Sequence, residues 1–335
     1  MTSETLIGPV KTSGKFGYVT PTGAYAIKPL FDELGDCSEG LISFRQSGQI
    51  GFMDLTGMVV IAPSFDSQPG SLPVFRSGLA AVVSNGRCGY LDVLGTWRIS
   101  PDWDWGWNYK EDYALVESRD GYFVIDQYGS IVSRLDVWDI QRWPDWVRDW
   151  SCFRCVFATI NGFAEGCIDL RGRTVFPPVH KRLTDFHSGV AAFSNDDDCF
   201  GLVRFDGELV KEPQYYGVSG FSQGLAAASR RPIATTVRTE VGFINLAGEW
   251  VIEPRFSQAF PFSEGLARVA VASAEPARGA RGIHRTYGFI DRCGELVVEP
   301  KYTHAADFSS GFSVVQLQGK YSVIDSRGKE IWREE

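Results

Sequence analysis

The sequence predicts an all-β protein of about nine tandem three-stranded antiparallel meander repeats, forming a curved solenoid or a propeller-like array. Two observations predict this fold. A pair of positions, mostly glycine, recurs along the whole chain, and its basic step is 34 residues. No stretch longer than a turn or two has the apolar period of a helix. The composition agrees, because 36 glycines and 13% aromatic residues are typical of strands joined by tight turns.

The first element of each repeat is a strand, a tight turn and a second strand, as in residues 51–61. A turn glycine supplies the positive φ that such a hairpin needs, and it stands at Gly23, Gly57, Gly95, Gly129, Gly172, Gly207, Gly248, Gly294 and Gly328. An anchor position lies six residues earlier, at Gly17, Gly51, Gly89, Phe123, Gly166, Gly201, Gly242, Gly288 and Ser322. Aspartates three residues before the glycine are interpreted as turn caps rather than as acids: Asp54, Asp92, Asp126, Asp169, Asp291 and Asp325.

The second strand is predicted to end at a proline six residues after the turn glycine, because proline cannot donate to a ladder. A glycine–apolar pair, such as Gly78–Leu79, then begins the third strand. One meander cannot bury its apolar face alone, so neighbouring repeats must stack. Uneven linkers favour an open solenoid over a closed propeller, but the sequence does not decide between the two arrangements.

The repeats predict a single β-repeat array over residues 1–335. Residues 6–100 hold regular repeats, 101–176 hold degenerate Trp-rich repeats, and 177–335 hold regular repeats with long insertions at the hairpin tips.

Charge and composition exclude several classes of protein. The formal charge of −8 makes binding of nucleic acid through phosphate neutralisation unlikely. The sequence has neither a run of 18 apolar residues nor the charged start and apolar core of a signal peptide, so we expect a soluble cytoplasmic protein without membrane contact. Seven scattered cysteines argue against a disulfide framework.

No motif of known chemistry stands out, so the sequence predicts a protein that is not an enzyme and has no cofactor or metal. Cys152 and Cys155 are the only close cysteine pair, and without a second pair at ligand spacing they are interpreted as core or edge residues. Cys167 occupies a core column of the repeat.

The clearest departures from the repeat are two Trp-rich segments, residues 101–113 and 135–150. The candidate binding residues there are Trp103, Trp105, Trp107, Trp138, Trp143, Trp146, Asp102 and Asp104. These side chains either thicken the core locally or form a recognition surface, since Trp dominates interface hot spots. Trp beside Asp suits a basic, apolar or sugar-like ligand.

The second departure is charge at the hairpin tips that join a third strand to the next repeat. Residues 195–198 are acidic, and the following two tips are basic, with candidate binding residues Arg230, Arg231, Arg278 and Arg281. Equivalent tips project from one edge of a stacked array, so we expect them to lie near one another. Neighbouring clusters of both signs are suited to protein docking.

The repeat resembles the WG-repeat family, whose units read roughly GxWGYIDxxGxxVIxPxYDxxxxFSEGLAxV. The copies that carry the resemblance are residues 14–32, 241–269 and 287–312. The tryptophan before the anchor is missing, and that position holds Phe16, Ile50, Cys88, Phe200, Val241 and Tyr287.

The resemblance implies a repeat scaffold without shared catalytic residues. Its expected function is non-catalytic binding of another protein, and the narrower expectation is an immunity or antitoxin-type protein that neutralises an effector by occlusion. Two alternatives stay open: binding of a carbohydrate or small ligand through the Trp/Asp segments, and a hydrolase in the degenerate middle repeats. The oligomeric state is not predicted.

Overall fold

The structure is a computed structural model that describes residues 6–66, 72–135, 139–140, 152–159, 162–169, 173–194, 199–230, 240–272 and 285–334. The chain divides into two compact units, the first comprising residues 1–158 and 167–175 and the second residues 159–166 and 176–335. Every regular element in the described part is a β-strand, which confirms the all-β prediction. A helix long and apolar enough to cross a membrane is not found among these residues.

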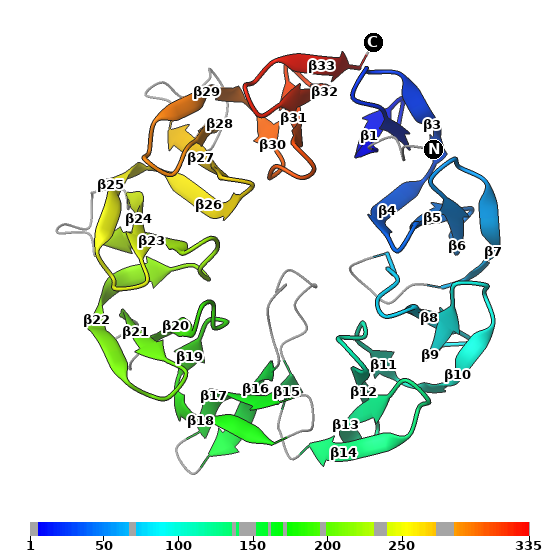
Figure 1. The fold of residues 1–335 in the computed structure, drawn as a ribbon, viewed down its shortest axis with the longest axis horizontal. Helices are drawn as coiled ribbons and strands as arrows, with labels where there is room; N and C mark the ends of the chain where they lie inside the picture. Colours follow the sequence, from blue (N-terminus) through cyan, green and yellow to red (C-terminus); the bar gives the residue numbers. More distant parts are fainter. Residues whose placement is uncertain are drawn as a thin grey trace, which may run out of the picture. The chain divides into compact units, whose positions relative to one another are not determined.

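Unit 1 contains four consecutive antiparallel sheets, which follow one another along an arc (Figure 1). Their strands are β1 (Ile7–Thr12), β2 (Lys15–Val19) and β3 (Tyr25–Phe31); β4 (Glu33–Ser38), β5 (Leu41–Gln46), β6 (Gln49–Asp54) and β7 (Val59–Phe65); β8 (Leu79–Ser84), β9 (Arg87–Asp92) and β10 (Trp97–Trp103); and β11 (Trp105–Gly106), β12 (Tyr113–Ser118), β13 (Gly121–Asp126) and β14 (Ile131–Leu135).

The division between the units falls within the next strands, β15 (Asp139–Ile140), β16 (Cys152–Thr159), β17 (Gly162–Asp169) and β18 (Thr174–His180). Cys152 and Cys155 both lie on β16.

Unit 2 contains a seven-stranded sheet followed by two four-stranded sheets. The first is formed by β19 (Arg182–Leu183), β20 (Val190–Ser194), β21 (Phe200–Arg204), β22 (Leu209–Val218), β23 (Leu225–Arg230), β24 (Val241–Asn245) and β25 (Trp250–Phe256). The others are formed by β26 (Gln258–Ser263), β27 (Leu266–Ala272), β28 (Arg285–Ile290) and β29 (Leu296–Tyr302), and by β30 (His304–Ala305), β31 (Phe312–Leu317), β32 (Lys320–Asp325) and β33 (Glu330–Arg333).

The predicted meander is present in these sheets, and the segments expected to be linkers add a short fourth strand to several of them. β4, β11, β26 and β30 are such strands, and each precedes the three strands of its meander. β22 is longer than its equivalents because it closes one meander and then pairs with β23, which begins the next. The seven-stranded sheet is therefore two repeats joined through one continuous strand.

The proline does not end the second strand of the hairpin, contrary to the prediction. β7 continues past Pro63 to Phe65, which pairs with Ile50. The register shifts between this pair and the pair Phe52–Ile61, so the proline lies in a bulge that needs no ladder donor. The bulge presses against the anchor glycine, because a Cβ on Gly51 would lie 2.7 Å from the Ile61 carbonyl oxygen and 2.8 Å from the Pro63 nitrogen.

The turn glycine and the aspartate cap are confirmed. Gly57 has a φ of 86°, and Asp54 Oδ1 accepts the backbone N–H groups of Thr56 (2.8 Å) and Met58 (3.0 Å). A hydrogen bond from the Thr56 hydroxyl also lowers the pKa of the Asp54 carboxyl. The same cap is formed by Asp92, Asp126, Asp169, Asp291 and Asp325.

Neighbouring repeats are held together by a recurring aromatic pair. The ring one residue after an anchor glycine packs on the ring that precedes the next glycine–apolar pair. Centroid distances are 4.8 Å for Phe52–Phe75, 5.0 Å for Tyr90–Tyr109, 4.8 Å for Phe243–Phe262 and 4.7 Å for Phe289–Phe308. The core of the array therefore lies between the sheets, as stacking of incomplete units requires.

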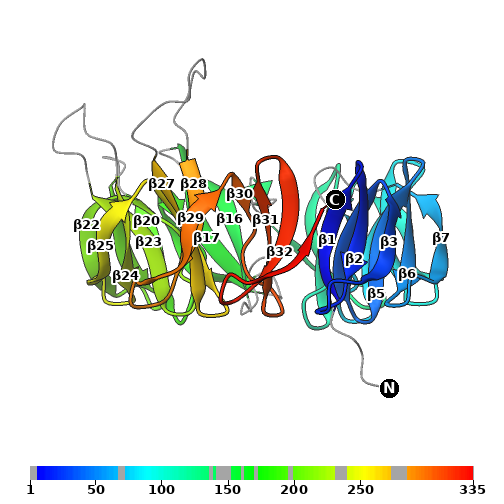
Figure 2. The same cartoon turned by 90° about the horizontal axis from the view of Figure 1, so that it is seen from above.

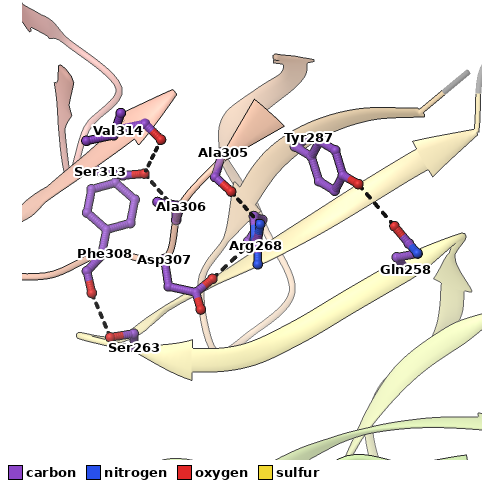
Figure 3. Close-up of polar contacts among 10 residues, drawn as sticks. All are labelled: Gln258, Ser263, Arg268, Tyr287, Ala305, Ala306, Asp307, Phe308, Ser313 and Val314. Carbon is purple, nitrogen blue, oxygen red and sulfur yellow. Dashed lines mark hydrogen bonds and ion pairs between the residues drawn. The ribbon is translucent and has the colours of Figure 1, made fainter. Parts of the chain in front are cut away.

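The first two strands of a four-stranded sheet, such as β4 and β5, are joined by a tight turn, and we call this turn and its equivalents in the other sheets the first tips. Hydrogen bonds link the first tips of consecutive repeats. The hydroxyls of Ser38 and Ser222 donate to the carbonyl oxygens of Phe75 and Phe262, each at 2.6 Å. The Ser263 hydroxyl donates in the same way to the Phe308 carbonyl oxygen at 2.7 Å (Figure 3). Side-chain oxygens of the next residue, such as Glu39, accept N–H groups from the following tip, here that of Gly78 at 2.9 Å.

The strands run up and down between two edges of each unit (Figure 2). Because the strands alternate in direction, the first tips and the aspartate-capped turns share one edge, which we call the turn edge. At the other edge β23 ends and β24 begins, and β27 ends and β28 begins; we call it the hairpin edge.

Candidate functional site

The Trp/Asp segment of unit 1 continues from the end of β10 into β11. Trp105 pairs with Glu117 of β12, and its ring lies 6.2 Å from the ring of Trp107, at an interplanar angle of 60°. The short β11 exists because the Asp104 and Trp107 amides donate to the Glu117 and Leu115 carbonyl oxygens. This pairing places Trp105 on the first strand of its sheet, with Trp107 directly after that strand.

All three described tryptophans of this segment are partly buried. Trp103 packs against the core between its own sheet and the next, with its ring 5.9 Å from that of Phe123. Trp107 packs against the following core and lies 6.2 Å from the Tyr122 ring. Part of the Trp103 indole and part of the Trp107 indole therefore thicken the local core.

The two aspartates of the segment are exposed. Asp104 forms an ion pair with Arg87, in which both side chains are more than 40% exposed. The same guanidinium donates to the main-chain carbonyl of Asp102. Arg87 thus fixes the loop between β10 and β11, while water screens the ion pair and limits its contribution to stability.

Arg230 is the one predicted hairpin-tip arginine within the described residues. It ends β23 at the hairpin edge, donates to Glu253 at 2.7 Å and lies 5.1 Å from the centroid of the Trp250 ring. The side chain is 59% exposed, so the stacked guanidinium presents a charged and aromatic surface. The other predicted residues lie outside the described part of the chain: Trp138, Trp143, Trp146, Arg231, Arg278, Arg281 and the acidic tip at 195–198.

Sequence reasoning missed exposed apolar side chains on the turn edge of unit 1. Met58, Leu94 and Tyr128 stand in the turns of three consecutive sheets and are 65%, 78% and 71% exposed. Each turn packs on the preceding repeat, and the Arg98 guanidinium of β10 lies 5.8 Å from the Tyr128 ring centroid. The signal was available in the alignment of repeats, because turn positions usually hold polar residues.

A second missed cluster surrounds Arg268 on β27 (Figure 3). Its guanidinium lies 3.7 Å from the centroid of the Phe260 ring, donates to the Ala305 carbonyl oxygen and pairs with Asp307 at 3.2 Å. Burial raises the pKa of the Asp307 carboxyl, against the opposing effect of Arg268. Both side chains are largely buried, so this cluster joins two repeats rather than facing a ligand.

The described cysteines and histidines do not form a reactive group. Cys167 is fully buried, as its core column predicts, and burial raises the pKa of the Cys88 thiol to about 12. Burial also lowers the pKa of His180. Within the described ranges, no three His, Cys, Asp or Glu side chains gather closely enough to hold a metal ion.

The family model described as "WG containing repeat" matches the chain seven times and covers more than half of it. The matched segments are residues 16–49, 50–88, 89–122, 166–197, 200–230, 242–271 and 287–321. The chain belongs to the WG-containing repeat family. In this WG-repeat protein the position of the missing tryptophan pairs with the aromatic that follows the proline, as Tyr287 does with Tyr302. The side chains there still pack across the bulge.

A comparison with curated protein sequences gave no match. Among solved structures, the chain is similar to Kluyveromyces lactis Hsv2 (10% identity, 77% of this chain and 93% of that chain, TM-score 0.43). It is similar to Saccharomyces cerevisiae Sqt1 (11%, 88% and 93%, TM-score 0.43). A third is the dihydro-heme d1 dehydrogenase NirN in complex with DHE (10%, 87% and 71%, TM-score 0.46). At these values the similarities say nothing about activity.

Proposed function

We propose that this WG-repeat protein is a non-catalytic scaffold that binds another protein, and that the turn edge of unit 1 is a principal contact. The observation that carries the proposal is the row of Met58, Leu94 and Tyr128, each at least 65% exposed. Large apolar side chains grouped on a surface mark sites that another molecule covers. Met58 follows its turn glycine, and unit 2 has Glu208, Glu249 and Glu295 at that position. Leu94 and Tyr128 precede theirs, and unit 2 has Asp206, Ala247 and Cys293 there, so the large apolar side chains of these two positions belong to unit 1.

The Trp/Asp segment supports the same function. Partly buried tryptophans lose little conformational freedom on binding, and Trp is enriched at interface hot spots. Exposed Asp102 and Asp104 beside them favour a partner with basic groups. The narrower form of the proposal is an immunity-type protein that blocks an effector by covering its active surface.

The experiment compares three immobilised forms of the full chain in a lysate of the source organism, with quantitative mass spectrometry of the retained proteins. They are the wild type, a turn-edge variant (Met58→Ser, Leu94→Ser, Tyr128→Ser) and a matched control (Leu209→Ser, Val251→Ser, Leu296→Ser). The control changes apolar residues of 44–46% exposure in unit 2. We expect a stoichiometric protein that the wild type and control retain and the turn-edge variant loses. Equal retention by all three would show that the turn edge is not the contact.

The exposed part of the Trp105–Trp107 pair favours one alternative, binding of a carbohydrate or small ligand. Indole faces stack on sugar rings, and the neighbouring carboxylates of Asp102 and Asp104 would accept hydrogen bonds from the sugar hydroxyl groups. A glycan that raises the melting temperature of the wild type, but not of Trp105→Ala, would favour this alternative. The same glycan should act unchanged on the turn-edge variant.

A further inference from the structure

The first hairpin tips of unit 2 bind carboxylate or amide oxygens within the chain. Glu264 places Oε1 2.6 Å from the Ser310 nitrogen and Oε2 2.7 Å from the Gly311 nitrogen of the next repeat. Both donors belong to a tight turn with positive φ, 55° at Ser310 and 83° at Gly311. This conformation directs two adjacent N–H groups outward, so they can share one carboxylate.

The tip at Gln223 and Gly224 has the same backbone, with φ values of 52° and 80°. Glu264 lies at the first tip one repeat before that of Ser310. At the first tip one repeat before that of Gln223, the equivalent residue is Ser188. A serine side chain is too short to reach across to the next tip. Within the described part of the chain, the N–H groups of Gln223 and Gly224 accordingly have no hydrogen-bond partner.

This tip also has a neighbouring cation and is fixed in place. The Arg292 guanidinium donates to the Gln223 carbonyl oxygen at 2.7 Å, which belongs to the same peptide group as the Gly224 N–H. The Gln223 side chain accepts the Gly265 N–H at 3.0 Å, so it holds the tip against the following repeat. Arg292 itself is exposed. Because the C=O and N–H of a trans peptide point in opposite directions, its guanidinium lies on the far side of this peptide group from the Gly224 N–H, and it acts on the tip by polarising the peptide and by its charge.

We propose that the Gln223 and Gly224 amides, together with Arg292, form a binding site for a carboxylate, supplied by a glutamate side chain of a protein partner. The partner would repeat the contact that Glu264 makes inside the chain. The hydrogen bond from Arg292 to the Gln223 carbonyl oxygen polarises the peptide group, which makes the Gly224 N–H a stronger donor, and the guanidinium adds a positive charge near the site. The proposal rests on the binding function proposed above only for the origin of the carboxylate, because binding of the carboxylate itself can be measured without a partner.

The test follows the backbone amide signals of the nitrogen-15-labelled full chain during titration with sodium acetate, against sodium chloride at matched ionic strength. We expect saturable shifts of the Gln223 and Gly224 signals. Gly311 should not respond, because Glu264 already occupies its amide. Gly189 is the control for an open tip of the same turn type: its φ is 79°, and within the described residues its amide has no hydrogen-bond partner and no arginine contacts its tip. An equal shift at Gly189 would overturn the proposal.

Two variants identify the groups that bind. Arg292→Gln should weaken acetate binding about threefold, because it removes a positive charge roughly 7 Å from the bound anion at an exposed site. Ser188→Glu should shift the Gly224 signal without acetate and abolish the response, because the new carboxylate occupies the tip. An unchanged affinity in Arg292→Gln would show that the guanidinium is not part of the site, even if Ser188→Glu does not fold.

Two peptides then distinguish the sources of the carboxylate. One has an internal glutamate and blocked ends, and the other has a free C-terminal carboxylate and no acidic side chain. A response to the first supports a glutamate side chain, whereas a response to the second alone overturns that assignment. The turn-edge variant should bind acetate normally, so failure of the proposed function and failure of this site give different results.

Discussion

The carboxylate of Glu264 accepts the backbone N–H of Gly311, 47 residues further along the chain, at 2.7 Å. The contact joins two repeats at the turn edge, next to the hydrogen bond from Ser263 to the Phe308 carbonyl oxygen. Consecutive residues of one tip therefore satisfy polar groups of the next tip. The FSEG segment of the repeat, here residues 262–265, is in this way an inter-repeat joint as well as a turn.

Replacing Glu264 should weaken this joint. Glu264→Ala removes two hydrogen bonds at an exposed site, so we expect the free energy of unfolding to fall by about 1–2 kcal/mol. Glu264→Gln should lose less, because Gln223 makes the equivalent contact with an amide oxygen. Urea denaturation measures the change, with Glu299→Ala as an exposed control on β29. Equal losses in the Glu264→Ala and Glu299→Ala variants would contradict the assigned role.

The anchor glycine should tolerate no side chain. A Cβ on Gly242 would lie 2.2 Å from the Ile252 carbonyl oxygen and 2.6 Å from the Pro254 nitrogen, both backbone atoms that cannot move alone. We expect Gly242→Ala to lower the free energy of unfolding by about 3 kcal/mol or to prevent folding. Gly220→Ala is the control, since a Cβ there meets nothing within 4 Å. Similar stability of the two variants, in thermal and urea unfolding, would refute the close contact.

The aspartate cap should be replaceable by asparagine but not by alanine. Asn245 occupies the same position in another repeat and accepts the Ala247 and Glu249 N–H groups at 3.0 Å. We therefore expect Asp54→Asn to keep most of the stability and Asp54→Ala to lose about 1 kcal/mol. The comparison is made by urea unfolding at neutral pH. A loss as large in Asp54→Asn would show that charge, rather than geometry, makes the cap.

Asp307 should give the protein a pH dependence of the opposite sign from that of the turn caps. Burial raises its pKa above the unfolded value of 3.8, so its contribution to stability is complete below that value and is lost as the pH rises through the folded pKa. For Asp54, whose pKa is lowered, stability is present above the unfolded pKa and is lost as the pH falls. The free energy of unfolding of the wild type and of Asp307→Asn, measured from about pH 4 to about pH 7, separates the effect of Asp307 from that of the turn caps. We expect the variant to gain stability relative to wild type as the pH rises, and a constant difference would contradict the shift.

The sequence by itself determined the repeat, the all-β class, the hairpin turns and the aspartate caps. These features depend on local backbone geometry, such as the positive φ of Gly57, and a residue type reports that geometry directly. The same holds for Cys167, whose buried position follows from its column in the repeat.

Only the tertiary structure decided the features that depend on contacts between distant residues. The bulge at Pro63 exists because Phe65 must reach Ile50, and the anchor glycine is needed because that bulge approaches it. The linker became a strand because backbone groups near Trp105 and Trp107 find partners on β12. The apolar turn edge and the Gln223–Gly224 tip likewise follow from how repeats stack, because stacking determines which side chains and amides a neighbour covers.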